Sequence, residues 1–304
     1  MNNDAVEAGV PRRAVRRTSA GSGTRPGDGP RSSLERPSSL VGMLERRRAA
    51  ERQMSDVFDD MPVPADVMPA RVTGELGFIL HAWDWSETSL LLDVLTVRFG
   101  RVFLVARGAR RASSQYRGLL TAFCPLRFSW SGSNEAKMLT RAEWQGTMVP
   151  LTGEALLSGF YVNELVLKLT CREERHPGLF EAYVAVIHDL ALGERDAVGP
   201  ALRRFEMTML KAAGWAPTIG PDPHPFYTVR AGEVVGIDDA SSLDAGETAW
   251  PGDAVRAWLA DGTLTAASQR VARDMLRALI EYHLDGRHIH SRRILAELNR
   301  LQRI

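Results

Sequence analysis

The sequence predicts an α+β protein in which a small β-barrel precedes a bundle of α-helices. Two observations carry this prediction. Strand-like segments fill residues 70–149, and the apolar spacing becomes helical after Pro150. Five strands in about 80 residues, with one short helix after the third strand, is the element order of an OB-fold barrel. We therefore expect an N-terminal OB-fold domain at residues 70–149 and an α-helical bundle domain with an irregular insertion at residues 150–304.

Residues 1–69 are expected to form a disordered extension. Residues 1–55 carry eleven Arg and six acids, a net charge of +5, and are rich in Gly, Ser and Pro, so they bury too little apolar surface to become ordered. Residues 56–69 carry four Asp and no base. Three interpretations stay open for the extension: a solvated tail, a translation start at Met43 or Met54, and an auxiliary arm that attracts phosphates.

The barrel strands follow from alternating apolar residues and from turn residues between them. The expected strands, in order, are RVTGELGFILHAWDW with bends at Gly74 and Gly77, TSLLLDVLTV, Val102 to Ala106 after a turn at Gly100, CPLRFSWSG, and AKMLTRAEWQGTMV after the turn SGSNE. The segment QYRGLLTAF between the third and fourth strands is expected to form the short helix.

The helices of the second domain follow from apolar residues at helical spacing and from helix-ending glycines and prolines. The expected helices are GEALLSGFYVNELVLKLT, PGLFEAYVAVIHDLAL, PALRRFEMTMLKAAG, DAVRAWLA, AASQRVARDMLRALIEYHL and SRRILAELNRLQ. Residues 215–250 are expected to be an irregular insertion, because five prolines lie between Pro217 and Pro251 and only GEVVGI is strand-like.

Several classes of protein are not supported by the sequence. No run of about 18 apolar residues is present to span a membrane, and no apolar segment follows the N-terminal arginines as in a secretory signal. Cys124 and Cys171 are far apart and outside any CxxC pair, which favours a reducing cytoplasm and gives no support to a metal site. No phosphate-binding, metalloprotease or nucleophile-elbow motif occurs, so we expect no enzyme, catalytic residue or cofactor.

One segment of the barrel domain has an unusual charge pattern. Residues 94–134 contain seven arginines and no Asp or Glu. Unopposed cations on a small barrel suit a polyanion, because each neutralised phosphate releases counterions. Tyr116, Phe128 and Trp130 lie among these charges and offer surfaces on which bases could stack. The alternative is that the strand residues Phe128 and Trp130 belong to the core.

Seven phrases in order, from about residue 72 to residue 298, resemble the DNA repair protein RecO family of recombination mediators. They are ILHAWDWSETSLLLDVLT, GRVFLVARGARR, RGLLTAFCPL, GFYVNELVLKL, LFEAYVAVI, LRRFEMTMLKAAGW and YHLDGRHIHSRRIL. Each phrase alone is weak, and their order and combination are specific. The resemblance leaves only the N-terminal extension uncovered.

The resemblance implies a function in DNA repair. It implies binding of single- and double-stranded DNA, annealing of complementary strands, and replacement of single-stranded DNA-binding protein by recombinase together with RecR. It further implies an interaction with the acidic C-terminal tail of single-stranded DNA-binding protein, an indirect connection with RecF, and a cytoplasmic, nucleoid-associated location. Many members carry four cysteines in the insertion, whereas residues 215–250 carry none. This chain is therefore expected to be a zinc-less member.

The resemblance also assigns candidate residues. The DNA role falls on the basic segment of the barrel: Arg101, Arg107, Arg110, Arg111, Tyr116, Arg117 and Arg127. The role of binding the partner's tail falls on the LRRFE phrase, at Arg203, Arg204 and Phe205. For Arg203 the alternative is a structural pair with Glu206 or another acid. Two other functions stay open: an RNA-binding OB protein, because charge alone does not separate RNA from DNA, and a structural adaptor with a solvated cationic face.

Overall fold

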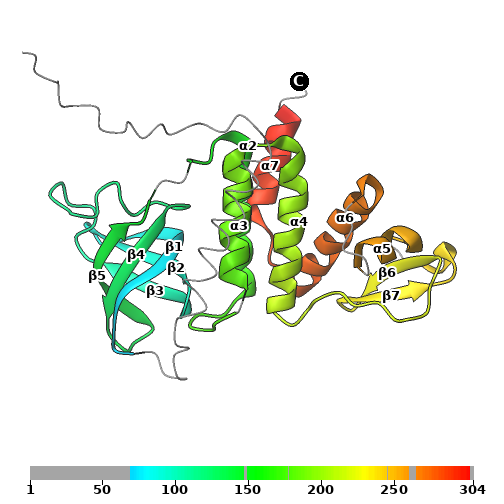
Figure 1. Ribbon diagram of the computed structural model, residues 1–304, viewed down its shortest axis with the longest axis horizontal. Coiled ribbons are helices and arrows are strands. Elements are labelled where there is room, and N and C mark those ends of the chain that lie inside the picture. Colours follow the sequence, from blue (N-terminus) through cyan, green and yellow to red (C-terminus); the bar gives the residue numbers. More distant parts are fainter. Residues whose placement is uncertain (1–68, 147–148, 177, 245, 260–264, 302–304) are drawn as a thin grey trace, which may run out of the picture. The chain divides into compact units, whose positions relative to one another are not determined.

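The computed structural model describes residues 69–146, 149–176, 178–244, 246–259 and 265–301. The predicted N-terminal extension, apart from its last residue, lies outside the described residues. Within the described residues, five strands come first and helices follow, with three short strands between two of the helices (Figure 1). The predicted α+β fold class is confirmed.

Five strands close into a barrel in the order β1-β2-β3-β5-β4. Their bounds are β1 Arg71–Trp85, β2 Ser89–Thr96, β3 Gly100–Ala106, β4 Pro125–Ser131 and β5 Ala136–Trp144. Strands β3 and β5 pair in parallel, and the other neighbours pair antiparallel. Every predicted strand is present, and the order is that of an OB-like barrel.

The barrel is filled by the inward side chains of its strands. Leu92, Val94, Leu104, Phe128 and Trp130 belong to one buried cluster, and none of them has exposed surface. Side chains alternate between the two faces of a strand, so these apolar residues alternate with outward-facing ones along each strand. The core of the first domain is thus the interior of the barrel.

The segment between β3 and β4 differs from the prediction. The sequence predicted a short helix there, and the structure has a series of turns from Arg107 to Gly118 instead. Gly108 and Gly118 adopt the left-handed conformation, with φ of 66° and 74°, which a helix does not tolerate. Gly118 therefore interrupts the expected helix of residues 115–123, and Gly108 lies in the turns before it.

The helices begin at Gly153. Their bounds are α2 Gly153–Leu169, α3 Leu179–Leu192, α4 Arg195–Ala212, α5 Gly252–Leu259, α6 Ala266–His283 and α7 His290–Leu301. Helices α2, α3 and α4 stand side by side, and α7 packs along α2 (Figure 1). All of the predicted helices are present, with boundaries that shift by a few residues.

The predicted irregular insertion contains a small sheet. Strands β6 (Phe226–Arg230), β7 (Glu233–Ile237) and β8 (Trp250–Pro251) pair in the order β7-β6-β8. Of these three strands, the sequence predicted only β7, in the segment GEVVGI. Tyr227 and Trp250 pair across the sheet and are buried, so apolar packing holds this region together. Strands β6 and β8 were not predicted, because the prolines interrupt the alternation of side chains that identifies a strand.

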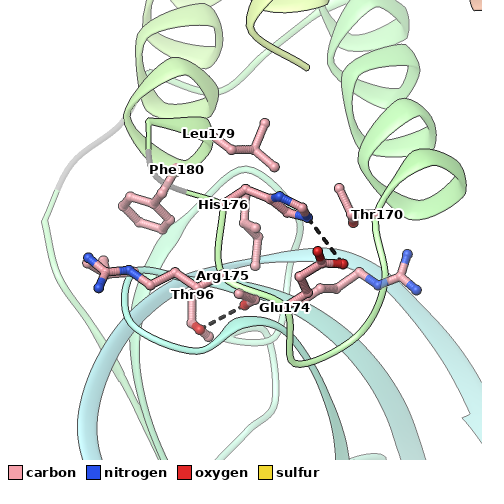
Figure 2. A pocket seen from close by; sticks show the side chains of 11 residues that line it. Thr96, Thr170, Glu174, Arg175, His176, Leu179 and Phe180 are labelled. Carbon is pink, nitrogen blue, oxygen red and sulfur yellow. Dashed lines mark hydrogen bonds and ion pairs between the residues drawn. The ribbon is translucent and has the colours of Figure 1, made fainter. Parts of the chain in front are cut away.

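The loop between α2 and α3 folds over the turn between β2 and β3. Gly100 has a φ of 61°, and a Cβ added there would lie 2.0 Å from the carbonyl oxygen of Glu174. Figure 2 shows the small pocket at this junction, where the Thr96 hydroxyl donates to the Gly100 carbonyl at 2.8 Å. Its volume of about 10 Å³ leaves room for no more than one water. This pocket is therefore a small packing gap between the barrel and the helices, too small to bind a ligand.

A buried amide joins β1 to the helices. The Asn163 side chain donates to the Leu80 carbonyl at 2.8 Å and accepts from the Tyr183 hydroxyl at 2.7 Å. Lys137 of β5, whose side chain has no exposed surface, pairs with Glu173 from the loop after α2. These polar contacts are satisfied only when the barrel and the helices are both folded.

Candidate nucleic-acid interface

The arginine-rich loop between β3 and β4 is anchored by small and aromatic residues. Ala109 and Tyr116 are buried and belong to the barrel core cluster. The Arg110 amide donates to the Thr88 carbonyl at 2.8 Å, and the Gly108 amide donates to the Ser89 hydroxyl at 3.4 Å. These anchors fix the backbone, so the intervening side chains must point away from the core.

Four of the predicted DNA-binding arginines lie on this loop. Arg107, Arg111 and Arg117 are exposed, and in the described part of the chain no acid forms an ion pair with any of them. The Arg110 side chain is 42% exposed and lies 3.2 Å from the Asp84 carboxylate, which is itself well exposed. An exposed pair of this kind contributes little to stability and leaves the guanidinium accessible. The loop therefore presents a group of accessible cations.

The other arginines of residues 94–134, the segment without Asp or Glu, bind partners that lie outside this segment. Arg98 binds the buried Glu75 carboxylate of β1 at 2.6 Å. Burial raises the pKa of Glu75, while the hydrogen bonds and charge of Arg98 lower it. Arg127 donates to Gln145 at 2.8 Å and to the Gly74 carbonyl at 2.9 Å, while remaining exposed.

Arg101 connects the barrel to the helices through its side-chain contacts. Its side chain is only 12% exposed, lies 3.2 Å from Asp93, and donates to the Leu167 carbonyl near the end of α2. Burial lowers the pKa of Arg101, and the Asp93 carboxylate acts in the opposite direction. A mostly buried guanidinium held between Asp93 and the end of α2 is not available to a phosphate. Arg101 therefore drops out of the exposed set that the sequence placed on the DNA-binding face.

The three aromatic residues that the sequence offered for base stacking are buried. Tyr116 is 7% exposed, and Phe128 and Trp130 are fully buried. The expectation of stacking on these side chains is therefore corrected: alternation points the two strand residues inward, and Tyr116 anchors the loop. The structure exposes Trp83 and Trp85 instead. The alternation in HAWDW was the signal that could have revealed these two.

The partner-binding candidates on α4 occupy three different settings. Arg203 binds both carboxylate oxygens of Glu206 at 2.6 Å, as the structural alternative predicted. Arg204 is half exposed and lies 2.8 Å from Asp189 of α3. Phe205 is buried with 1% exposed, so it offers no surface to a partner.

A groove of about 1040 Å³ lies where α2, α4, α6 and α7 meet. Leu157, Leu202, Leu284 and Ile289 supply apolar lining. Two acids of the lining, Asp274 and Glu281, pair with Arg273 and Arg277. The charged lining is still mainly basic: Arg203, Arg273, Arg277, Arg287, Arg292 and Arg293. Arg204 and Phe205 do not line it. Of the three candidates on α4, only Arg203 faces a space that a peptide could enter.

A buried network underlies this groove. The Tyr161 hydroxyl donates to Glu206 at 2.6 Å and accepts from Arg292 at 2.6 Å. Burial raises the pKa of Tyr161 well above its usual value, and the neighbouring Glu206 carboxylate raises it further. The phenol therefore stays protonated and links α2, α4 and α7.

No metal-binding cluster is found within the described residues: no three His, Cys, Asp or Glu side chains gather in a suitable arrangement. The thiolate ligands of the family's zinc form do not fit residues 215–250, which lack cysteine, and both cysteines of the chain lie elsewhere. Among the helices that the structure describes, none has the length and apolar character needed to cross a membrane.

Comparisons with known proteins all match one family. The family model "Recombination protein O N terminal" matches residues 72–148, and "Recombination protein O C terminal" matches residues 150–220. A DNA repair protein RecO of Aromatoleum aromaticum is 38% identical over 244 residues, which cover 76% of this chain and 98% of the relative. Another from Laribacter hongkongensis is 41% identical over 241 residues, 76% of this chain and 96% of the relative. A third, from Cupriavidus pinatubonensis, is 40% identical over 273 residues, 86% of this chain and 90% of the relative.

Proposed function

The chain belongs to the recombination protein O family of DNA repair proteins, and from this premise we propose that it acts as a recombination mediator that binds DNA through its barrel. In this proposal it binds single- and double-stranded DNA, anneals complementary strands, and helps replace single-stranded DNA-binding protein with recombinase. It does so by binding, without catalysing a covalent reaction, in the cytoplasm at the nucleoid.

One observation carries the proposal: the anchored loop presents Arg107, Arg111 and Arg117 outward with no acid paired to them in the described part of the chain. Arginine is well suited to phosphate because its planar guanidinium donates two parallel hydrogen bonds. The loop backbone is already fixed through Ala109 and Tyr116, so little conformational freedom is lost when a strand binds. Arg110, which pairs with Asp84, and Arg127, which donates to Gln145 and Gly74, are exposed but partnered and are therefore secondary candidates.

The test is the salt dependence of DNA binding. Substituting Arg107, Arg111 and Arg117 by Ala should weaken binding of a single-stranded oligomer, and each lost phosphate contact should reduce the log–log salt slope by about 0.7. Arg273→Ala is the matched control, since this arginine is exposed on α6 and outside the barrel. A folded triple variant with an unchanged slope would refute the proposal. A matched RNA oligomer that binds more tightly would favour an RNA-binding function instead.

We further propose that the groove between α2, α4, α6 and α7 receives the acidic C-terminal tail of single-stranded DNA-binding protein. Arginines beside apolar walls suit a peptide that combines carboxylates with an aromatic side chain. Arg203 is engaged by the buried Glu206, so in this proposal it orients the groove. Arg277 pairs with Glu281 at 2.8 Å, but both side chains are at least half exposed, so this weak surface pair leaves Arg277 the more accessible cation. Partnership with RecR, and an indirect connection with RecF, are proposed on family membership alone.

Peptide affinity measured by fluorescence anisotropy tests the groove. Arg277→Ala and Arg203→Ala should weaken binding of an acidic peptide with a free terminal carboxylate by about 10-fold or more, the value of one charge-assisted hydrogen bond. Arg204→Ala should not, because Arg204 faces Asp189 outside the groove. All three variants should bind naked DNA as the unaltered protein does. Equal losses in all three would show that the groove is not the binding site.

A further inference from the structure

Two exposed tryptophans stand in one row on the outer face of the barrel. Trp83 is 40% exposed and Trp85 is 55% exposed. They are two residues apart on β1, so both project from the same face of the strand. The antiparallel register places Trp83 opposite Leu91 and Trp85 opposite Ser89 of β2, and Leu91 in turn lies opposite Val105 of β3. The row therefore lies on the outward surface of the sheet formed by β1, β2 and β3.

The end of the row at Trp85 lies next to the start of the arginine-rich loop. Ser89, the cross-strand partner of Trp85, accepts a hydrogen bond from the Gly108 amide of that loop. Asp84, between the two tryptophans on the chain, lies 3.2 Å from Arg110 of the loop. Arg107 directly follows β3, whose last residue, Ala106, pairs with Leu90. The row and the arginine-rich loop therefore meet at one end of the barrel. Because Asp84 alternates with the two tryptophans, its partner Arg110 lies on the other face of β1 from the indoles.

Two rings hold Trp83 in place, and within the described residues no parallel ring covers it. The His81 and Phe103 rings meet it edge to face, at centroid distances of 4.4 Å and 6.2 Å. Phe103 is itself held by the Arg172 guanidinium 4.0 Å from its ring centroid, and Arg172 binds the buried Asp93 at 2.9 Å. Burial lowers the pKa of Arg172, but the hydrogen bonds to Asp93 and Glu135 outweigh this effect and raise it. The permanent cation beneath Phe103 therefore stabilises the base of the row.

Single strands fit this row better than duplexes. Side chains two residues apart on a strand stand about 6.8 Å apart, twice the 3.4 Å spacing of stacked bases along one DNA strand. Bases in a duplex cannot separate to this spacing without unstacking, and their faces are already covered by their neighbours. An unpaired strand can place one base on each indole while its phosphates run beside the arginines.

We propose that Trp83 and Trp85 form a base-stacking platform for single-stranded nucleic acid, which works together with the phosphate contacts of Arg107 and Arg111. The inference rests on the proposed function and deepens it by assigning which side chains contact bases. It also gives the two surfaces different roles: the arginine-rich loop binds phosphates, and the two tryptophans bind unpaired bases.

The experiment compares two single-stranded probes of equal length and charge. One is oligothymidylate, and the other is an abasic oligomer that keeps the sugar-phosphate backbone. Trp83→Ala and Trp85→Ala should each weaken oligothymidylate binding by about 5- to 150-fold, the range measured for one base stacked on an aromatic ring. Binding of the abasic oligomer should stay within about twofold, and the salt slope should not change, because no phosphate contact is lost.

Two further variants serve as controls. Trp144→Ala removes an equally exposed tryptophan from β5, where it lies opposite Leu126 of β4 and outside the row, and it should bind both probes as before. Trp83→Phe keeps a stacking surface and should retain most of the affinity for oligothymidylate. Circular dichroism and thermal melting check that each variant is folded.

The outcomes separate the platform from the proposed function. If the unaltered protein binds neither probe, the proposed DNA-binding function fails. If it binds both probes equally and the Trp83 and Trp85 variants do so too, DNA binding stands and the platform is refuted. Equal losses on both probes would also refute it, since they would mean that the substitutions disturb the arginine-rich loop.

Discussion

At the scale of single residues, Glu164 of α2 contributes to the attachment of the C-terminal helix. Its carboxylate accepts from the backbone amides of His290 and Ser291 at 2.7 and 2.9 Å, the first residues of α7. The first amides of a helix have no partner within the helix, and its N-terminus carries partial positive charge. A carboxylate from another helix satisfies both requirements and attaches α7 to α2.

The pH dependence of stability should report this contact. Burial alone raises the pKa of Glu164, but hydrogen bonds from Lys168, Ser291 and His290 outweigh it and lower the pKa to about 2. Because the folded-state pKa lies below the ordinary value of 4.5, the stabilisation is complete above pH 4.5 and is lost as the pH falls towards 2. Glu164→Gln should therefore cost about 2 kcal/mol at pH 7 and progressively less below pH 4.5.

Urea denaturation of both proteins between pH 7 and pH 3 measures this difference. Glu297→Gln is the control, because the exposed Glu297 carboxylate lies 4.0 Å from Arg293 in a surface pair, which contributes at most about 0.5 kcal/mol. A cost for Glu164→Gln that does not change with pH would show that the carboxylate charge is not responsible.

The candidate site was only partly predictable from residues in a linear window. The acid-free segment assigned Arg107, Arg111 and Arg117 to the DNA-binding set, and all three are exposed in the structure. It could not show that Glu75 of β1 and Asp93 of β2 pair with Arg98 and Arg101, because these partners lie outside the window and meet the arginines only across the sheet. Which arginines remain accessible is decided by strand pairing, which composition does not encode.

At the scale of elements, the turn between β2 and β3 depends on one glycine. Gly100 lies in the left-handed region, and the added Cβ of an alanine would collide with the Glu174 carbonyl, a backbone atom that cannot rotate away. Gly100→Ala should destabilise the protein by more than about 2 kcal/mol, the sum of backbone strain and displacement of the α2–α3 loop. The midpoint of urea denaturation measures the cost.

Gly118 supplies the comparison for Gly100. It has a φ of 74°, and a Cβ added there would meet nothing within 4 Å. Gly118→Ala should therefore cost only the strain of the left-handed backbone, about 1 kcal/mol. Equal costs at the two positions would mean that the loop over Gly100 moves aside freely.

Elements were predictable where one periodicity ran uninterrupted. Alternation located all five barrel strands, and helical spacing located the helices. The segment from Arg107 to Gly118 was wrongly expected to contain the start of a helix, because its apolar residues anchor turns. Strands β6 and β8 were missed, because the first follows a run of prolines and the second is only two residues long. Local signals fail where tertiary packing rather than periodicity decides the backbone.

At the scale of the whole molecule, the sequence predicted an α+β chain with a barrel before its helices, and the structure confirms that fold class. Polar contacts between the two parts could not be foreseen. Asn163 on α2 reads as one polar residue on an apolar helix, yet its amide satisfies Leu80 and Tyr183 at once. Such bridges connect residues 83 positions apart, a separation at which sequence patterns give no information.

The same bridges have a consequence for the order in which the chain becomes folded during synthesis. The barrel closes by pairing β1 with β4 and β3 with β5, so no closed barrel exists before Trp144 has left the ribosome. Even then, the buried Lys137 still lacks Glu173, and Asp93, already paired with Arg101, lacks its second partner Arg172; both later residues emerge about 30 residues after Trp144. The nascent barrel therefore holds the Lys137 ammonium without its acidic partner until α2 and the loop after it are made. Ribosome-bound chains that stop between these points would hold a closed but loosely packed barrel.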